Sequence, residues 1–328
     1  MQYWATTLGW SVDALMSAKE YEQHAEAVRR TGANPITKTP INNGYSLTLV
    51  NTFVDLQWVD NLHGKLPIVL WIHEGNSVVH KTNLTPAQIA EIFAKANLLI
   101  FDTNWQREHV FRSFLDKIPP ARITSVHCGI RPLNRPDTAA LASRDAGRLR
   151  VLNIGSVYPR KRQIDMARAL VNLASQYPIH GDFVGDLTYI GRWSDTEADF
   201  ITGPHDCLTW HGMIGDDAKE ALIQVCDIGC FPSGEETFGI SALEIASASR
   251  PIVLADLEVY NHVGWAHGVN CLKYRAGDII TLQRHIEALV RAPALRHRLG
   301  AAGRLLSLKY SEPTFCETIT YALEHQLS

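Results

Sequence analysis

Short apolar runs alternate with helical patterns along the chain, and this alternation limits the fold more than any other feature. In the first half, strand-like runs occupy residues 2–7, 46–52, 67–72, 98–101 and 123–127, and helical patterns occupy residues 12–30, 86–96 and 105–115. Apolar strands that alternate with helices form parallel sheets covered by helices on both faces. The helix at 86–96 has a clear start, because Thr85 can cap it and Pro86 suits the first helical position.

The alternation restarts in the second half, with strand-like runs at 150–155, 187–191, 207–210, 227–231, 251–255 and 270–274 and helical patterns at 163–175, 216–226, 239–249 and 279–291. A polar segment at 133–148 separates the two series and is predicted to be a linker. Two series in 328 residues predict an α/β protein of two doubly wound, Rossmann-like domains. We expect one domain at 1–148, linker included, a second at 149–310, and a final helix at 311–328 that packs across both.

Charge and composition exclude several classes of protein. The net charge of −3 gives no sign of a nucleic-acid-binding protein. Residues 1–148 contain 15 Lys and Arg against 13 Asp and Glu, a balance of +2, whereas residues 149–328 contain 16 against 21, a balance of −5. So small a basic surplus in the first domain is weak evidence for contact with anionic lipid.

The six cysteines include no C-x-x-C pair, which favours buried thiols in a reducing compartment over a disulfide framework. The chain has no basic-then-apolar leader at Met1 and no apolar run of about 18 residues. We therefore expect a soluble cytoplasmic protein without a transmembrane helix, which touches a membrane at its surface at most.

A strand-to-helix segment at residues 231–244, FPSGEETFGISALE, is the strongest candidate for a binding site. The free N–H groups at the start of a helix attract phosphate and sugar oxygens. Glu236 precedes this helix and Glu244 lies eight residues later, so both carboxylates can reach one cleft and accept hydrogen bonds from hydroxyl groups. From spacing alone, a helix cap at Glu236 and a solvated Glu244 fit equally well.

A basic turn, GSVYPRKRQ at residues 155–163, follows the first strand of the second domain. Its cations Arg160, Lys161 and Arg162 stand at a helix entrance, where they suit a diphosphate. A solvated basic turn is the alternative. Because ligands of open parallel sheets lie beyond the carboxyl ends of the strands, we expect this turn and the 231–244 segment to line one interdomain cleft.

His73 directly follows the apolar run at 67–72 of the first domain, in the sequence WIHEGN. A lone histidine is more often structural, but the end of a buried strand directs this one to the cleft. We assign His73 to the active centre and leave Glu74 as either a base or a cap. The chain contains no Asp-x-Asp, no Walker A pattern and no histidine spacing typical of a metal site.

The run PSGEETFGISALEIASASRPIVLAD resembles the signature of retaining glycosyltransferase family 4, whose members have the GT-B fold. The E-x7-E pair of that family falls on Glu236 and Glu244, while Thr237 and Ser249 replace two of its glycines. The resemblance implies that Glu236 approaches the donor sugar and that Glu244 holds the ribose. Backbone amides that hold the sugar would come from Phe238, Gly239 and Ile240.

The resemblance extends over about residues 150–310 and includes the basic turn, where Gly155 opens the family motif. Lys161 matches the lysine that neutralises the diphosphate leaving group. Ser156 stands where the family usually has an arginine, so Arg160 or Arg162 has to supply that charge.

Three further positions follow from a looser resemblance. His73 matches a histidine close to the donor sugar and the acceptor, and the backbone near Met213 matches a stretch that contacts the nucleotide base. Gly9 is the candidate for close backbone approach to the diphosphate, since the glycine loop usual in the first domain is absent.

Together with the resemblance, these residues predict a metal-independent, hexosyltransferase-type enzyme that moves a hexose-like sugar from a UDP- or GDP-sugar to a hydroxyl acceptor. The resemblance implies a retained anomeric configuration. The acceptor is open among a saccharide, a lipid-linked acceptor and a natural-product aglycone, and no nucleic-acid partner is expected. Two alternatives remain: a sugar-nucleotide epimerase, which would act on the donor alone, and a non-catalytic subunit that binds a nucleotide sugar.

Overall fold

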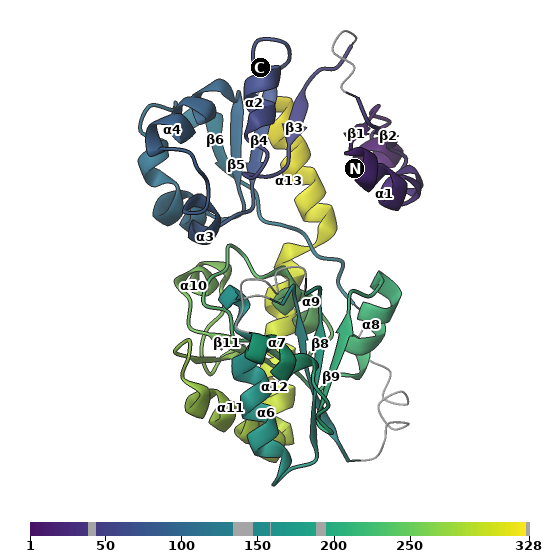
Figure 1. Cartoon of the computed structure of the whole chain (residues 1–328), viewed down its shortest axis with the longest axis vertical. Helices are drawn as coiled ribbons and strands as arrows, with labels where there is room; N and C mark the ends of the chain where they lie inside the picture. Colours follow the sequence, from purple (N-terminus) through teal and green to yellow (C-terminus); the bar gives the residue numbers. More distant parts are fainter. Residues whose placement is uncertain (39–43, 134–146, 158, 188–194, 326–328) are drawn as a thin grey trace.

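The computed structural model describes residues 1–38, 44–133, 147–157, 159–187 and 195–325, and its main bodies are two parallel sheets with helices around them (Figure 1). The upper body in Figure 1 holds a four-stranded sheet in the order β3-β4-β5-β6, and the lower body holds a six-stranded sheet in the order β12-β11-β10-β7-β8-β9. Every strand pair in both sheets is parallel.

The first domain is built on β3 (Thr48–Val50), β4 (Ile68–Ile72), β5 (Leu98–Phe101) and β6 (Ile123–Ser125). Its helical segments are α2 (Gln57–Leu62), α3 (Asn76–Val79), α4 (Pro86–Lys95), η2 (Gln106–Val110), η3 (Arg112–Phe114) and η4 (Pro120–Arg122). All residues of β4 and β5 are buried, because α2 and α4 cover one face of the sheet and α13 (Glu312–His325) covers the other.

The predicted start of the α4 helix is confirmed, since Thr85 and Gln88 form a reciprocal capping box and Pro86 is the first helical residue. The predicted helix at 105–115 is wrong in detail, because it breaks into η2 and η3. The Gln106 side chain, at the start of η2, donates to the carbonyls of Ile72 at the end of β4 and of Glu74 in the loop that follows.

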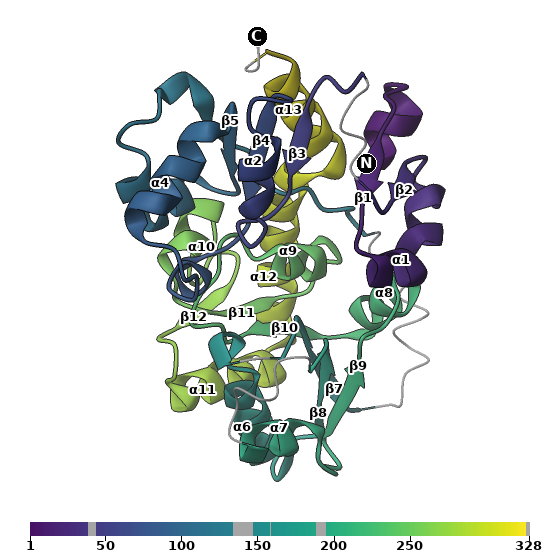
Figure 2. The same cartoon turned by 45° about the horizontal axis from the view of Figure 1, so that its top comes forward.

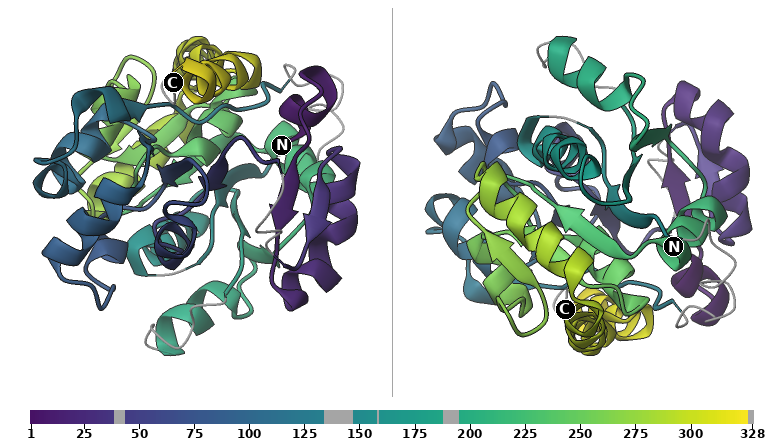
Figure 3. Two further views of the ribbon diagram at one scale, coloured as in Figure 1. Left: turned by 90° about the horizontal axis from the view of Figure 1, so that it is seen from above. Right: turned by 90° about the horizontal axis from the view of Figure 1, so that it is seen from below.

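The strand predicted at 2–7 is wrong. Residues Tyr3–Thr7 form a π-helical turn, η1, in which Trp4 stacks on Trp10 and donates from Nε1 to Thr320 of α13 at 3.0 Å. A separate two-stranded sheet follows, with β1 (Asp13–Leu15) and β2 (Asn34–Ile36) around α1 (Ala18–Arg30). The helix starts at Ala18 and not at residue 12, because Ser17 caps it. Figures 2 and 3 show this N-terminal unit at one side of the larger sheets.

The second domain contains β7 (Leu149–Ile154), β8 (Ile179–Val184), β9 (Leu208–Gly212), β10 (Ile228–Phe231), β11 (Ile252–Ala255) and β12 (Leu272–Tyr274). Its helical segments are η5 (Pro159–Lys161), α6 (Gln163–Ala174), α7 (Asp195–Thr202), α8 (Asp216–Val225), α9 (Ile240–Ser247), α10 (Glu258–Val263), α11 (Ile279–Arg291), α12 (Pro293–Ser307) and η7 (Leu308–Tyr310).

Strand β8 was not predicted, because IHGDFV mixes polar and apolar residues without a clear alternation. Of the strand predicted at 187–191, residues 188–191 lie outside the described residues, and so do residues 134–146 of the predicted linker. Within the described chain, no helix combines the length and apolar character needed to cross a bilayer.

The order of the six strands reverses at β7. The chain runs outward from β7 through β8 to β9, returns to β10 on the other side of β7, and then continues to β11 and β12. A crevice forms outside the carboxyl ends of the two strands at such a reversal, and ligands of doubly wound sheets bind there. The predicted α/β architecture of two Rossmann-like domains is confirmed, and the strand order places the ligand crevice after β7 and β10.

Candidate functional site

The two loops at this crevice are tied together by their backbones. The loop after β7 carries the basic turn, and the loop after β10 carries the two adjacent acids Glu235 and Glu236. The Gly234 amide donates to the Arg160 carbonyl at 2.7 Å, and the Arg160 guanidinium donates to the Glu235 carbonyl at 3.0 Å. The Gln163 side chain holds the start of the first loop, donating to the carbonyls of Gly155 and Ser156 at 3.3 and 3.1 Å.

Glu236 is the centre of the site in the second domain. Its carboxylate is 7% exposed and lies 2.6 Å from Lys161 Nζ, 2.7 Å from the Ser233 hydroxyl and 3.8 Å from an Arg160 nitrogen. Burial alone would raise the pKa of Glu236, but the charges of Lys161 and Arg160 and the two hydrogen bonds outweigh it and hold the pKa below its ordinary value. The carboxylate is therefore ionised and fixed in place.

The structure separates the two arginines that the sequence left as alternatives. Arg160 turns toward Glu236, whereas Arg162 has a left-handed backbone with φ 50° and pairs with Asp165 of α6 at 2.8 Å. Lys161 and Arg160 thus form the cationic side of the crevice.

Glu244 lies inside α9, where its carboxylate is 3.0 Å from Lys219 of α8. Burial would lower the pKa of Lys219, but the charges of Glu244 and Asp216 outweigh it and raise that pKa. Lys219 was not singled out from the sequence, because nothing in the spacing of two different helices links it to Glu244.

The predicted donor-binding residues near the start of α9, and Met213 after β9, differ in how exposed they are to a ligand. Phe238 is 1% exposed and packs against His127 and Tyr310, which leaves only its backbone for contact with a ligand. Gly239 caps the helix with φ 90°, and a Cβ there would lie 2.7 Å from a ring carbon of Tyr260. Ile240 and Met213 are 39% and 77% exposed, so both are open to a ligand.

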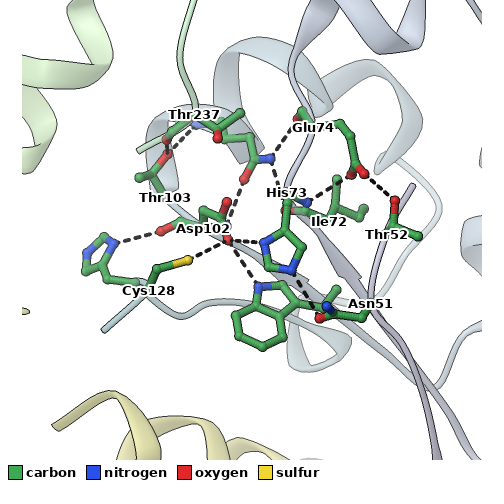
Figure 4. A network of polar contacts seen from close by, with 12 residues as sticks. Asn51, Thr52, Ile72, His73, Glu74, Asp102, Thr103, Cys128 and Thr237 are labelled. Atoms are coloured by element: carbon green, nitrogen blue, oxygen red, sulfur yellow. Dashed lines mark hydrogen bonds and ion pairs between the residues drawn. The ribbon is translucent and has the colours of Figure 1, made fainter. Parts of the chain in front are cut away.

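His73 stands at the end of β4, between a buried acid and an exposed amide (Figure 4). Its Nδ1 is 2.9 Å from Asp102 Oδ1, and its Nε2 is 3.1 Å from Asn51 Oδ1. Burial would lower the pKa of His73, but the hydrogen bond and charge of Asp102 and the charge of Glu74 outweigh it and raise that pKa. Asp102 itself was missed from the sequence, since a single acid after an apolar strand carries no pattern.

Glu74 acts as a clamp for the loop and not as a free base. Its carboxylate accepts hydrogen bonds from the Thr52 hydroxyl, from the Phe53 amide at 2.9 Å and from the His73 amide at 3.0 Å. Of the two roles left open for Glu74, the contacts fit the cap.

The His73 loop meets the Glu236 loop directly. The Ser77 amide donates to the Glu235 carboxylate at 3.0 Å, and the Thr103 hydroxyl donates to the Thr237 carbonyl at 3.3 Å. Gly75 leaves room for this contact, since a Cβ there would overlap Glu235 Oε1. The residues on either side of Glu236 are thus bound to the first domain beside His73.

Gly9 is the least connected of the predicted site residues. It follows η1 with φ 68°, and a Cβ there would meet no atom within 4 Å among the described residues. Its positive φ agrees with a glycine requirement, but no described contact joins it to the crevice after β7 and β10.

Comparison with known proteins finds similarity to glycosyltransferases. The family model described as "Glycosyl transferases group 1" matches residues 140–306. The chain is 37% identical over 93 residues to the phosphatidyl-myo-inositol mannosyltransferase of Mycobacterium leprae, and this match covers 28% of the chain but only 25% of that protein.

Solved structures show the same fold at low sequence identity. Anabaena Alr3699/HepE in complex with UDP and glucose has a TM-score of 0.76 at 17% identity, and the match covers 91% of this chain and 88% of that one. Sucrose-phosphate synthase of Thermosynechococcus elongatus has a TM-score of 0.70 at 16% identity, with 94% and 80% covered. With the family model spanning more than half of its residues, the chain belongs to the glycosyl transferases group 1 family and has the GT-B fold.

Proposed function

We propose that this protein transfers a sugar from a UDP- or GDP-sugar to a hydroxyl acceptor, with retention of the anomeric configuration and without a metal ion. The observation that carries the proposal is the Glu236 cluster, in which Lys161 and Arg160 converge on one buried carboxylate at the strand-order reversal. Such a cluster offers fixed positive charge to a diphosphate and a fixed carboxylate to sugar hydroxyls.

Each site residue has a role in this reaction. The bond from the anomeric carbon to the diphosphate breaks, a bond to the acceptor oxygen forms, and the acceptor proton leaves with the nucleoside diphosphate. Lys161 and Arg160 stabilise the charge that develops on the diphosphate, so no metal is required. Glu236 orients the sugar, and His73 approaches the sugar from the first domain.

The remaining predicted residues bind the donor without taking part in bond breaking. Glu244 holds the ribose, and the backbone at Met213 contacts the base. The diphosphate and the sugar lie against backbone groups from three places. These are the loop after β7 (Gly155 and Ser156), the start of α9 (Phe238, Gly239 and Ile240) and the N-terminal segment (Gly9).

The UDP complexes of the Anabaena relative favour a UDP-sugar as the first donor to test. The acceptor belongs to one of three classes, which are saccharides, lipid-linked acceptors and natural-product aglycones. The name of the mycobacterial relative favours a lipid-linked acceptor. We expect a cytoplasmic enzyme that meets such an acceptor at the membrane surface.

A screen of nucleotide sugars by thermal shift identifies the donor, since a ligand at 100 times its Kd stabilises a protein by about 2.7 kcal/mol. Glu236→Gln should then lower the turnover number by roughly 100-fold or more, the range seen when one fixed electrostatic partner of a transition state is lost. The control is Glu220→Gln, which neutralises an exposed carboxylate on α8. Equal turnover of wild type and Glu236→Gln would contradict the assignment.

A further inference from the structure

Asp102 accepts three side-chain hydrogen bonds on a single oxygen. Its carboxylate is buried, and Oδ1 lies 3.2 Å from Trp71 Nε1, 2.9 Å from His73 Nδ1 and 3.5 Å from Cys128 Sγ (Figure 4). The Asp102 backbone is held as well, because its amide donates to the Gln106 side chain and its carbonyl contacts His127. So many contacts leave Asp102 little freedom to move.

Strand register brings Asp102 to His73. Strands β4 and β5 pair in parallel with Ile72 opposite Phe101, so the next residues, His73 and Asp102, leave the same edge of the sheet side by side. The His73 ring then extends from the buried carboxylate at Nδ1 toward the exposed Asn51 side chain at Nε2. The Asp102 carboxylate and the Asn51 amide oxygen can each only accept, so both nitrogens carry a hydrogen here and the ring is the imidazolium. When the ring is neutral, the Asp102 carboxylate keeps the remaining hydrogen on Nδ1.

We propose that Asp102 is a positioning residue, which keeps a hydrogen on His73 Nδ1 in the charged and the neutral ring and directs Nε2 toward the cleft, where a sugar or acceptor hydroxyl replaces Asn51. This inference rests on the proposed function, in which His73 approaches the reacting sugar. A histidine nitrogen has its role set by the hydrogen bond that the other nitrogen makes. The raised pKa of His73, caused by Asp102 and Glu74, agrees with this arrangement.

A metal ion is the competing explanation, because ligand atoms of His73, Asp102 and Cys128 lie within 4.8 Å of one another. The Trp71 indole argues against it. An indole nitrogen only donates, and its hydrogen points at Oδ1, the oxygen that also faces His73 and Cys128. Hydrogen bonds account for all three donors around this oxygen.

The first test observes the histidine directly in the full-length protein. Nitrogen-detected NMR of the 14 histidine rings, with the His73 signal identified by its loss in His73→Gln, gives the tautomer and pKa of His73 without any donor. Wild type should show the Nδ1–H form when neutral. Asp102→Asn should lower the His73 pKa, whereas Cys128→Ala removes another donor from Asp102 and should leave the His73 pKa above its ordinary value. A neutral His73 in the Nε2–H form in wild type overturns the proposal, even if Asp102→Asn fails to fold.

The second test follows the release of UDP from the donor found in the thermal-shift screen. Asp102→Asn should reduce kcat by roughly tenfold to 100-fold, at the lower end of what direct proton transfer contributes. The limb of the pH profile that titrates with His73 should move to lower pH. In a His73→Gln background, Asp102→Asn should add almost nothing, because it acts through the ring.

The outcomes separate this proposal from the function it rests on. No turnover of any nucleotide sugar by wild type contradicts the proposed function and leaves the NMR result to decide the role of Asp102. Active wild type with an unchanged pH profile in Asp102→Asn overturns only the positioning role. One equivalent of zinc in the purified protein, lost in both Asp102→Asn and Cys128→Ala, would also overturn it, because the three residues would then form a metal site.

Discussion

At the scale of single residues, the site depends on opposite charges held at short range in a buried place. Lys161 and Glu236 lie 2.6 Å apart, with side chains 20% and 8% exposed. Removal of one partner from such a pair leaves the other charge partly desolvated and uncompensated. Under the proposed function, a bound diphosphate would give Lys161 a new anionic partner and free Glu236 for the sugar.

Lys161→Ala should chiefly weaken binding of the diphosphate. A hydrogen bond to a charged group contributes about 1.5–3 kcal/mol, which corresponds to a rise in the Kd of UDP by roughly 10- to 100-fold. Arg168→Ala removes a charge from the exposed side of α6 and is the matched control. Calorimetry with UDP measures both, and an equal Kd in wild type and Lys161→Ala would contradict the role of this lysine.

The lowered pKa of Glu236 also predicts how its contribution to stability depends on pH. Because the folded pKa lies below the unfolded one, the ionised carboxylate stabilises the protein above about pH 4.3, the ordinary value for glutamate. This contribution is lost as the pH falls through the folded pKa. At pH 7, Glu236→Gln should be less stable than wild type by about 1.5–3 kcal/mol. The difference between their thermal midpoints should shrink in acid, and a constant difference from pH 7 to 3 would refute the assignment.

At the scale of elements, the start of α9 depends on one backbone conformation. Gly239 has φ 90° and directs the chain from the Glu236 loop into the helix that carries Glu244. A side chain there meets two obstacles, which are the left-handed backbone and the ring of Tyr260. The fully buried Tyr260 has little room to move away.

Gly239→Ala should therefore destabilise the protein more than another glycine of positive φ. Gly268 is the control, because it has φ 73° and no atom lies within 4 Å of an added Cβ. Gly268→Ala should be less stable than wild type by the backbone strain alone, about 1–2 kcal/mol. Gly239→Ala adds a steric clash and should also lose UDP binding. Chemical denaturation and calorimetry measure these effects, and equal losses in both variants would exclude the clash.

At the scale of the whole molecule, the acid next to Glu236 joins the two domains. The Glu235 carboxylate accepts a hydrogen bond from the Ser77 amide, 158 positions away in sequence. Gly75, at the N-cap of α3, gives this carboxylate its space. This contact between the domains near His73 thus depends on a glycine from one side and a carboxylate from the other. Closure of such a cleft excludes water from the donor.

Gly75→Ala should open the cleft without unfolding either domain. The backbone at Gly75 has φ −108°, which alanine adopts easily, so the added methyl group acts only on Glu235. Gly215→Ala is the control, because Gly215 also precedes a helix and has open space around it. The radius of gyration from small-angle scattering should rise in Gly75→Ala alone, with a change in unfolding free energy below about 1 kcal/mol. An unchanged radius would mean that this contact does not hold the domains together.

The parts of the fold that were predictable are those specified over a few residues. Thr85 and Pro86 predict the start of α4, and the apolar run at Leu98–Phe101 predicts both ends of β5 correctly. The wrong prediction at the N-terminus has a tertiary cause. The run at Tyr3–Thr7 has strand-like composition, but contacts of Trp4 with Trp10 and Thr320 hold it as a helical turn. Tertiary contacts override a weak local preference in such places.

In the candidate site too, local patterns and tertiary contacts determine different features. The sequence by itself determined which candidate site residues follow β4, β7 and β10. A histidine, a basic turn and a carboxylate after buried strands are local patterns. Only the tertiary structure decided their partners: Lys161 with Glu236 across 75 positions, His73 with Asp102 across 29, and Lys219 with Glu244 across 25. It also chose Arg160 over Arg162 for the crevice. Such pairings depend on strand order and register, which bring distant segments together and which no local pattern encodes.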